Sequence, residues 1–346
     1  MRYFNYIEDR NIFYKEPEHF MLSSDKETLS HALGATLYIP ATRDRLLKDI
    51  LTSMAHTVVI CLEDSVPTSL LEEVENNLFS LFERIESESK DNKSFLNLLP
   101  LIFIRVRNKE QLQRILEKSK LIGLCGFVLP KFKAVDGKGY LEIISKHNKV
   151  YNKNLYAMPI LETAEIIFKE TRINELLNIK KVLDEYKETV LVVRIGGTDF
   201  SGIYSLRRNK EVTIYDVSVI RDCIIDIVNI FKRDGYVISA AVNEYFDHNS
   251  EVLIKEALLD KANGFLGKTV IHPKQVKLIN SLMVVSKEEF LDAEAILKSD
   301  IDGVIRSAYL NKMNEVKPHL NWAKEVMLLS KITGVLNDGR DFRDLL

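Results

Sequence analysis

The segment Thr57-Val-Val-Ile-Cys-Leu-Glu-Asp64 joins six mostly apolar residues, three of them β-branched valine or isoleucine, directly to two carboxylates. An apolar run of this length is too short for a free-standing helix and is typical of a buried strand. Charged residues at the end of such a strand are typical of the functional rim of a parallel barrel. The segment therefore predicts a buried strand with a polar site at its carboxyl end.

Seven further runs of this kind occur along the chain, each bounded by turn-forming or charged residues. The eight predicted strands cover residues 35–40, 57–62, 101–106, 126–129, 155–161, 191–195, 237–242 and 264–271. The segments between them carry apolar residues at spacings of three and four, as amphipathic helices do. Near-continuous apolar strands that alternate with helices predict an α/β fold, a (β/α)8 TIM barrel with additional C-terminal helices. An open doubly wound sheet has the same alternation, but no Gly-x-Gly-x-x-Gly turn follows the first strand, and this favours the barrel.

Three regions are expected from this pattern: an N-terminal arm over 1–33, the barrel over 34–300, and a C-terminal helical extension over 301–346. Ser286 and Glu289 have the spacing of a capping box and predict a helix that starts there. The extension is expected to serve as a lid or as an oligomer contact, so a homo-oligomer is expected.

Composition excludes several classes of protein. The formal charge is −2 and no basic stripe is present, so nucleic acid is not an expected partner. No apolar stretch approaches the roughly 18 to 20 residues that span a bilayer, and residues 1–25 lack a signal-peptide core, so a cytoplasmic protein without a membrane partner is expected. Neither the three cysteines nor the seven histidines show zinc-ligand spacing. Any metal must therefore be bound by carboxylates.

Charged residues stand at the C-terminal ends of five successive predicted strands: Glu63 and Asp64, Arg105 and Arg107, Lys131, Glu162, and Asp199. Each alone is readily explained as a solvated loop charge. Together they would converge at the rim of a barrel, where neighbouring carboxylates need a cation between them. A site of few protein oxygens suits Mg²⁺, with Mn²⁺ as an alternative. Gly197 is expected to let the backbone approach a ligand, and Lys131 is either a substrate contact or a rim charge.

The chain resembles the HpcH/HpaI aldolase and citrate lyase β-subunit superfamily in an ordered set of motifs. These are Leu37-Tyr-Ile-Pro40 with Arg43, Cys61-Leu-Glu-Asp-Ser-Val66, Ile104-Arg-Val106, Leu129-Pro-Lys131, Ile160-Leu-Glu-Thr-Ala164, Gly196-Gly-Thr-Asp199 and Gly267-Lys-Thr-Val-Ile-His-Pro-Lys-Gln275. Around Leu33-Gly-Ala-Thr-Leu-Tyr38 it is also similar to a divergent carbon–carbon lyase subgroup found in tellurium-resistance-associated operons.

The resemblance implies a Mg²⁺-dependent lyase on a TIM barrel. It implies Glu162 and Asp199 as direct metal ligands, and Glu63 and Asp64 as residues that hold metal-bound waters. It also implies that Arg105 contacts the substrate carboxylate and the developing enolate oxygen. Arg43 matches an arginine at the cofactor or thioester end.

Two positions depart from the family pattern: Arg107 stands where asparagine is usual, and Ala41 where glycine is common. Both fall on substrate-facing positions, so the acyl-CoA substrate is an open question and Arg107 is predicted to bind substrate or cofactor.

The predicted function is metal-dependent cleavage or formation of a carbon–carbon bond next to a carbonyl. The substrate is a small molecule, either a 2-oxo acid or a coenzyme A thioester. A catalytically inactive ligand-binding barrel, or a subunit of a larger biosynthetic assembly, is the alternative from another class. A third alternative keeps the metal and transfers an enolate of the phosphoenolpyruvate type.

Overall fold

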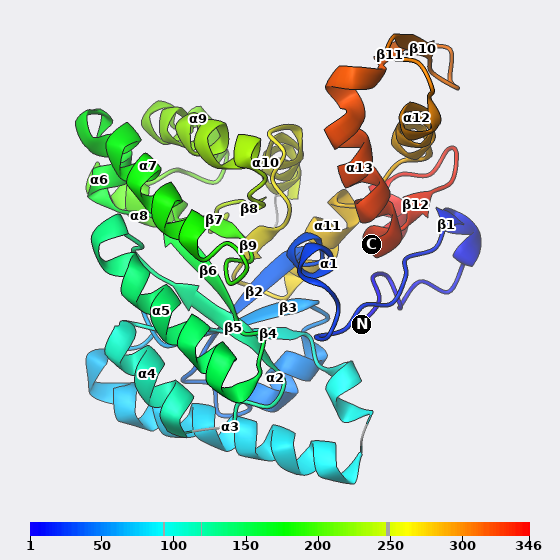
Figure 1. The fold of residues 1–346 in the computed structure, drawn as a ribbon. Helices are drawn as coiled ribbons and strands as arrows, with labels where there is room; N and C mark the ends of the chain where they lie inside the picture. Colours follow the sequence, from blue (N-terminus) through cyan, green and yellow to red (C-terminus); the bar gives the residue numbers. More distant parts are fainter. Residues whose placement is uncertain (93, 119, 247–249) are drawn as a thin grey trace. The chain divides into compact units, whose positions relative to one another are not determined.

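The computed structural model describes residues 1–92, 94–118, 120–246 and 250–346 (Figure 1). Residues 33–279 form one compact unit, and residues 1–32 together with 280–346 form a second. None of the helices in these described ranges is long and apolar enough to cross a membrane.

The first unit is built on eight parallel strands, which confirms the predicted TIM barrel. The sheet order is β8-β7-β6-β5-β4-β3-β2-β9, and a parallel bridge from Ala240 to Lys268 joins its two ends. The strands are β2 (Ala35–Pro40), β3 (Thr57–Cys61), β4 (Leu101–Arg105), β5 (Leu124–Leu129), β6 (Tyr156–Leu161), β7 (Val193–Ile195), β8 (Ile238–Ser239) and β9 (Lys268–Val270). Each overlaps a predicted strand, and the last three are at least two residues shorter than predicted.

Every residue of β3 and β4 is buried, because one face of each strand points into the barrel and the other lies under helices. Figure 1 shows helices such as α3, α4, α5 and α7 outside the sheet. The helices are α2 (Leu46–Thr52), α3 (Leu71–Asp91), α4 (Lys109–Lys118), α5 (Ala134–Tyr151), α6 (Ala164–Ile167), α7 (Lys169–Glu185), α8 (Gly197–Ile203), α9 (Ser218–Phe231), α10 (Ser250–Ala262) and α11 (Lys274–Leu282), the last of which runs into the second unit. Single 3₁₀ turns occupy η2 (Thr68–Leu70), η3 (Phe95–Leu98), η4 (Ile214–Asp216) and η5 (Lys232–Asp234).

The second unit brings the two ends of the chain together, because β1 pairs antiparallel with β12. Its elements are η1 (Arg10–Ile12), β1 (Phe13–Lys15), α1 (Lys26–His31), α12 (Lys287–Lys298), β10 (Val304–Arg306), β11 (Met313–Glu315), α13 (Val316–Thr333), β12 (Val335–Leu336) and η6 (Phe342–Leu345). The predicted capping box is present at Ser286, whose hydroxyl accepts from the backbone N–H of Glu289.

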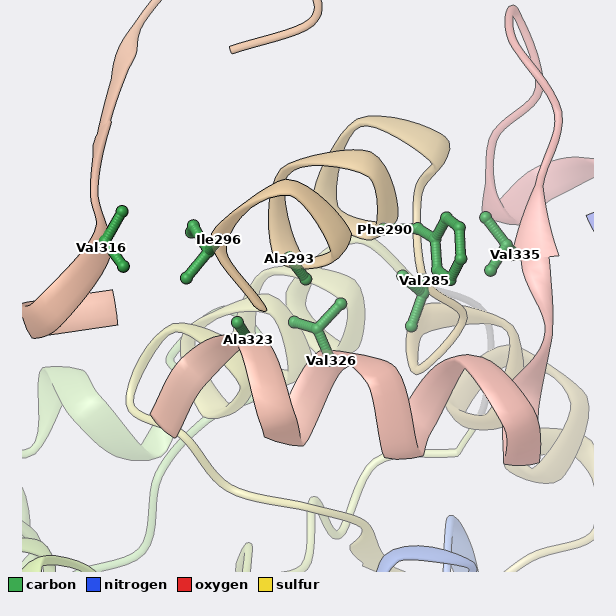
Figure 2. Close-up of a cluster of buried hydrophobic side chains, with 8 residues drawn as sticks. All are labelled: Val285, Phe290, Ala293, Ile296, Val316, Ala323, Val326 and Val335. Atoms are coloured by element: carbon green, nitrogen blue, oxygen red, sulfur yellow. The ribbon is translucent and has the colours of Figure 1, made fainter. Parts of the chain in front are cut away.

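A small hydrophobic core holds this second unit together (Figure 2). It consists of Val285, Phe290, Ala293, Ile296, Val316, Ala323, Val326 and Val335. The segment predicted as helical from residue 301 begins instead with the hairpin β10–β11, and the helix starts only at Val316. Val304, Ile305 and Arg306 pair antiparallel with Glu315, Asn314 and Met313, and in each strand the middle residue is the most buried, as the two-residue period of a strand requires.

Candidate functional site

Three strands deliver carboxylates to the same end of the barrel. Glu63 and Asp64 follow β3, Glu162 follows β6, and Asp199 lies in α8 just after β7. Because all eight strands are parallel, their carboxyl ends share one rim. A cavity of about 200 Å³ lies there, and Asp64, Glu162 and Asp199 line it.

Arg105, at the end of β4, lies between these carboxylates. Its Nη2 is 2.7 Å from Glu63 Oε2, 2.9 Å from Asp64 Oδ2 and 3.3 Å from Glu162 Oε1. Burial opposes its charge, yet Tyr38 and the nearby carboxylates outweigh burial and raise the pKa of this guanidinium. Arg105 is therefore a permanent positive charge in the middle of the acidic group.

Lys131 supplies a second positive charge through an unusual backbone conformation. Its φ of 47° lies in the left-handed region, which is unfavourable for a residue with a Cβ. In this conformation its backbone N–H donates to Glu162 Oε1 at 2.8 Å. Its Nζ lies 2.6 Å from Glu63 Oε1, 3.3 Å from Asp64 Oδ1 and 3.8 Å from Asp199 Oδ1. One strained residue thus contacts all four predicted acidic residues.

The environment of Glu162 opposes its ionisation. Burial raises the pKa of this carboxyl to about 8, and the charge of Asp199 adds to the effect although Arg105 and Lys131 act against it. A Cβ on Gly196 would lie 2.2 Å from Glu162 Oε2, so only glycine fits beside this carboxylate.

The pKa values of Glu63 and Asp64 move in opposite directions. Burial raises the pKa of Glu63. Burial would also raise the pKa of Asp64, but its interaction with Glu63 and the charges of Arg105 and Lys131 lower it. The positive charges of Arg105 and Lys131 therefore face four carboxyl groups, so carboxyl groups outnumber positive charges in this site.

The donor set fits a hard divalent cation. The acidic side chains offer only carboxylate oxygens as ligand atoms. Mg²⁺ needs only one or two protein carboxylates, because waters and substrate oxygens complete its coordination shell. No group of three histidine, cysteine, aspartate or glutamate side chains in the described ranges is arranged as a metal cage. Asp64, Glu162 and Asp199 all line the cavity, and the choice of Glu162 and Asp199 as the direct ligands stays a prediction.

Two other predicted site residues, Gly197 and Arg107, lie around this group. Gly197 lines the cavity, and a Cβ there would lie 2.4 Å from Ile214 Cδ1. Arg107 lines a second cavity of about 300 Å³ together with Glu63 and Lys131.

The Arg107 guanidinium donates to Val66 O at 2.6 Å and to Thr68 Oγ1 at 3.2 Å, so it fixes the loop after β3. Arg43 does not line either cavity. Its largely exposed side chain pairs with Asp49 at 2.8 Å, and its role at the thioester end stays a prediction.

Sequence reasoning missed three residues that line the cavity: Tyr38 on β2, Arg194 on β7 and Thr269 on β9. Tyr38 and Thr269 stand inside motifs that resemble the superfamily, where nothing marks them as inward-facing. Arg194 had a detectable signal, because it is the one charge within the otherwise apolar run of residues 191–195.

Comparison with known proteins gives a family and several structural neighbours. A family model described as a carbon–carbon bond lyase of the TIM-barrel fold matches residues 27–335. CitE from Mycobacterium tuberculosis, in complex with magnesium, acetoacetate and coenzyme A, has 18% sequence identity and a TM-score of 0.61, covering 87% of this chain and 99% of its own.

Two further solved structures have the same barrel. A citrate lyase from Burkholderia xenovorans LB400 has 16% identity and a TM-score of 0.67, covering 91% of this chain and 96% of its own. A malate synthase from Haloferax volcanii has 14% identity and a TM-score of 0.56, covering 71% of each chain. At these identities the similarity shows a shared fold. Comparison with curated sequences gave no match.

Proposed function

Because this chain belongs to the family of carbon–carbon bond lyases of the TIM-barrel fold, we propose that it is a Mg²⁺-dependent lyase or aldolase. It makes or breaks a bond next to the carbonyl of a 2-oxo acid or an acyl-CoA-type substrate. The observation that carries the proposal is the convergence of Glu63, Asp64, Glu162 and Asp199 on Arg105 and Lys131 at one rim.

Each residue has a distinct part in this proposal. Glu162 and Asp199 would hold Mg²⁺, for which Mn²⁺ could substitute, and Glu63 and Asp64 would orient waters beside the ion. When bound, the ion supplies Lewis-acid polarisation of the substrate carbonyl. Arg105 places a fixed positive charge where the enolate oxygen becomes negative, and its fork suits the substrate carboxylate. Lys131 orients Glu63 and Asp64 through its ammonium group.

Structural neighbours support the choice of ligands. The Mycobacterium tuberculosis CitE structure contains magnesium, acetoacetate and coenzyme A, and another citrate lyase β-subunit structure from that organism contains oxaloacetate and magnesium. We extend magnesium and a small carbonyl substrate to this chain on the basis of its own carboxylates. The homo-oligomer expected from the sequence is part of the proposal, and analytical ultracentrifugation tests it.

Titration calorimetry with MgCl₂ alone tests the metal site, with Glu162→Gln and Asp199→Asn as the variants. Removal of a direct ligand should weaken Mg²⁺ binding by more than about tenfold. Glu165→Gln is the matched control, because Glu165 follows the same strand but pairs with Lys133 and does not line the cavity. Its Mg²⁺ affinity should equal that of the wild type.

A lyase assay over 2-oxo acids and acyl-CoA thioesters completes the test. Turnover should require Mg²⁺, stop with EDTA and fall in both variants. The metal mechanism would be wrong if wild-type turnover survives EDTA and if both variants keep wild-type turnover. Mg²⁺ binding without conversion of any substrate would instead favour the ligand-binding barrel.

A further inference from the structure

Arg194 is a buried cation that has no carboxylate partner in the described part of the chain. Only 1% of its surface is exposed. Its Nη2 donates to Thr269 Oγ1 at 2.6 Å, its Nη1 makes a weak contact to Met158 Sδ at 3.9 Å, and its guanidinium lies 5.7 Å from the ring centroid of Tyr38. A guanidinium has five N–H donors, so these contacts leave most of them without a protein acceptor.

The other buried cations of the barrel are treated differently. Arg105 contacts three carboxylates, Arg172 pairs with two aspartates, Arg208 pairs with two glutamates, and Lys268 pairs with Glu256 and Asp260. A buried charge is strongly unfavourable unless an opposite charge accompanies it. The environment of Arg194 is therefore incomplete, and the missing component is an anion.

The cavity beside Arg194 shows where that anion enters. Arg194 lines the same cavity as Glu162 and Asp199, and so do Tyr38 and Thr269. The Tyr38 hydroxyl makes no hydrogen bond to any residue that the structure describes. Burial raises its pKa, although Arg194 and Arg105 act against this, so the hydroxyl stays protonated and is available as a donor.

We propose that Arg194 and Tyr38 form a subsite for a second anionic group of the substrate, a carboxylate or a phosphate. Arg105 already contacts Glu63, Asp64 and Glu162 through its Nη2, whereas Arg194 can offer a planar pair of N–H donors to two oxygens of a second anionic group. The inference rests on the proposed function and deepens it: the substrate carries one anionic group next to the reacting carbonyl and another at Arg194. A dianionic substrate, rather than a simple monocarboxylate, is the class that this site selects.

A matched pair of probes tests the subsite: 2-oxoglutarate and 2-oxovalerate have the same chain length, and only the first has a second carboxylate. Calorimetry in MgCl₂ should show wild-type protein binding 2-oxoglutarate about 10- to 100-fold more tightly. In Arg194→Gln this preference should fall to about twofold or less, while 2-oxovalerate binding changes little. Inorganic phosphate and acetate, added as competitors, distinguish a phosphate from a carboxylate as the second anionic group. Stronger competition by phosphate than by acetate assigns a phosphate group, and stronger competition by acetate assigns a carboxylate.

Two further variants keep the test decisive if Arg194→Gln does not fold, which circular dichroism and Tm would reveal. Arg194→Lys keeps the charge without the fork, and Tyr38→Phe removes only the hydroxyl. Each should reduce the preference for the dianion, the first more than the second.

The possible results separate the subsite from the proposed function. Equal wild-type affinity for the two oxo acids, or an unchanged preference in a folded Arg194 variant, overturns the subsite. Binding of 2-oxovalerate that does not depend on Mg²⁺, with the dianion preference still lost in Arg194→Gln, overturns the metal mechanism and leaves the subsite standing.

Discussion

Replacement of Lys268 by methionine should destabilise the barrel strongly. Lys268 is fully buried on β9 and forms, with Ala240, the bridge that joins the two ends of the sheet. Its Nζ lies 2.9 Å from Glu256 Oε1 and 2.7 Å from Asp260 Oδ2, and both carboxylates are also buried. Methionine fills nearly the same volume, so the main change is the loss of the charge.

The magnitude follows from what is left behind. Arg208 still pairs with Glu256. Among the described residues, Asp260 keeps only the hydroxyl of Tyr215, which donates to its Oδ1 at 2.6 Å. Removing one partner of a buried ion pair costs about 3 to 5 kcal/mol of the free energy of unfolding. With total stabilities of about 5 to 15 kcal/mol, and about 2 to 4 °C of Tm per kcal/mol at this size, Tm should fall by roughly 6 to 20 °C.

The loss should also depend on pH. Burial raises the pKa of Asp260 above its unfolded value, and Lys268 limits that rise. A carboxyl with a raised folded pKa binds more protons in the folded state, so it destabilises the protein as pH rises above about 4. Without Lys268 the pKa of Asp260 rises further. The loss of unfolding free energy in Lys268→Met should therefore be smaller at pH 5 than at pH 8.

Urea unfolding followed by far-UV circular dichroism measures this effect, because the only tryptophan, Trp322, lies in the other unit. Lys255→Met is the matched control: Lys255 is exposed on α10 and lies 3.9 Å from Asp216, so it should lose less than about 1 kcal/mol. Addition of Asp260→Asn to Lys268→Met should recover part of the stability. A loss under about 1 kcal/mol, or one that is equal at both pH values, would refute the reasoning.

Three further predictions follow from the packing. Gly196→Ala should abolish Mg²⁺ binding in calorimetry, because its Cβ would lie 2.2 Å from Glu162 Oε2, whereas Gly202→Ala, with open space around it, should bind Mg²⁺ normally. Phe290→Ala should destabilise the second unit by about 3 to 5 kcal/mol, because Phe290 belongs to its hydrophobic cluster (Figure 2). The urea midpoint measured by Trp fluorescence should fall, and an unchanged midpoint would show that this cluster is not the core of the unit. Burial raises the pKa of the Cys125 thiol, so a cysteine-selective reagent should label Cys125 only after unfolding, as peptide mass spectrometry can show.

The barrel could be predicted because its signal is local and repeated. Runs such as 58–62 and 101–104 are apolar throughout, as is typical of strands covered on both faces. The acidic residues after β3 and β6 could be predicted for the same reason, since parallel strands necessarily end at one rim.

The sequence by itself thus determined the eight-stranded alternation, the capping box at Ser286, and which charges stand at strand ends. Tertiary structure alone decided that Lys131 bends into the left-handed region to contact the carboxylates, and that Arg107 fixes a loop. It also decided that Arg194 faces the cavity without a carboxylate partner among the residues that the structure describes. The physical reason is that electrostatic partners in this barrel are separated by tens of residues, as Lys131 and Glu63 are, so no local pattern records which charges will meet.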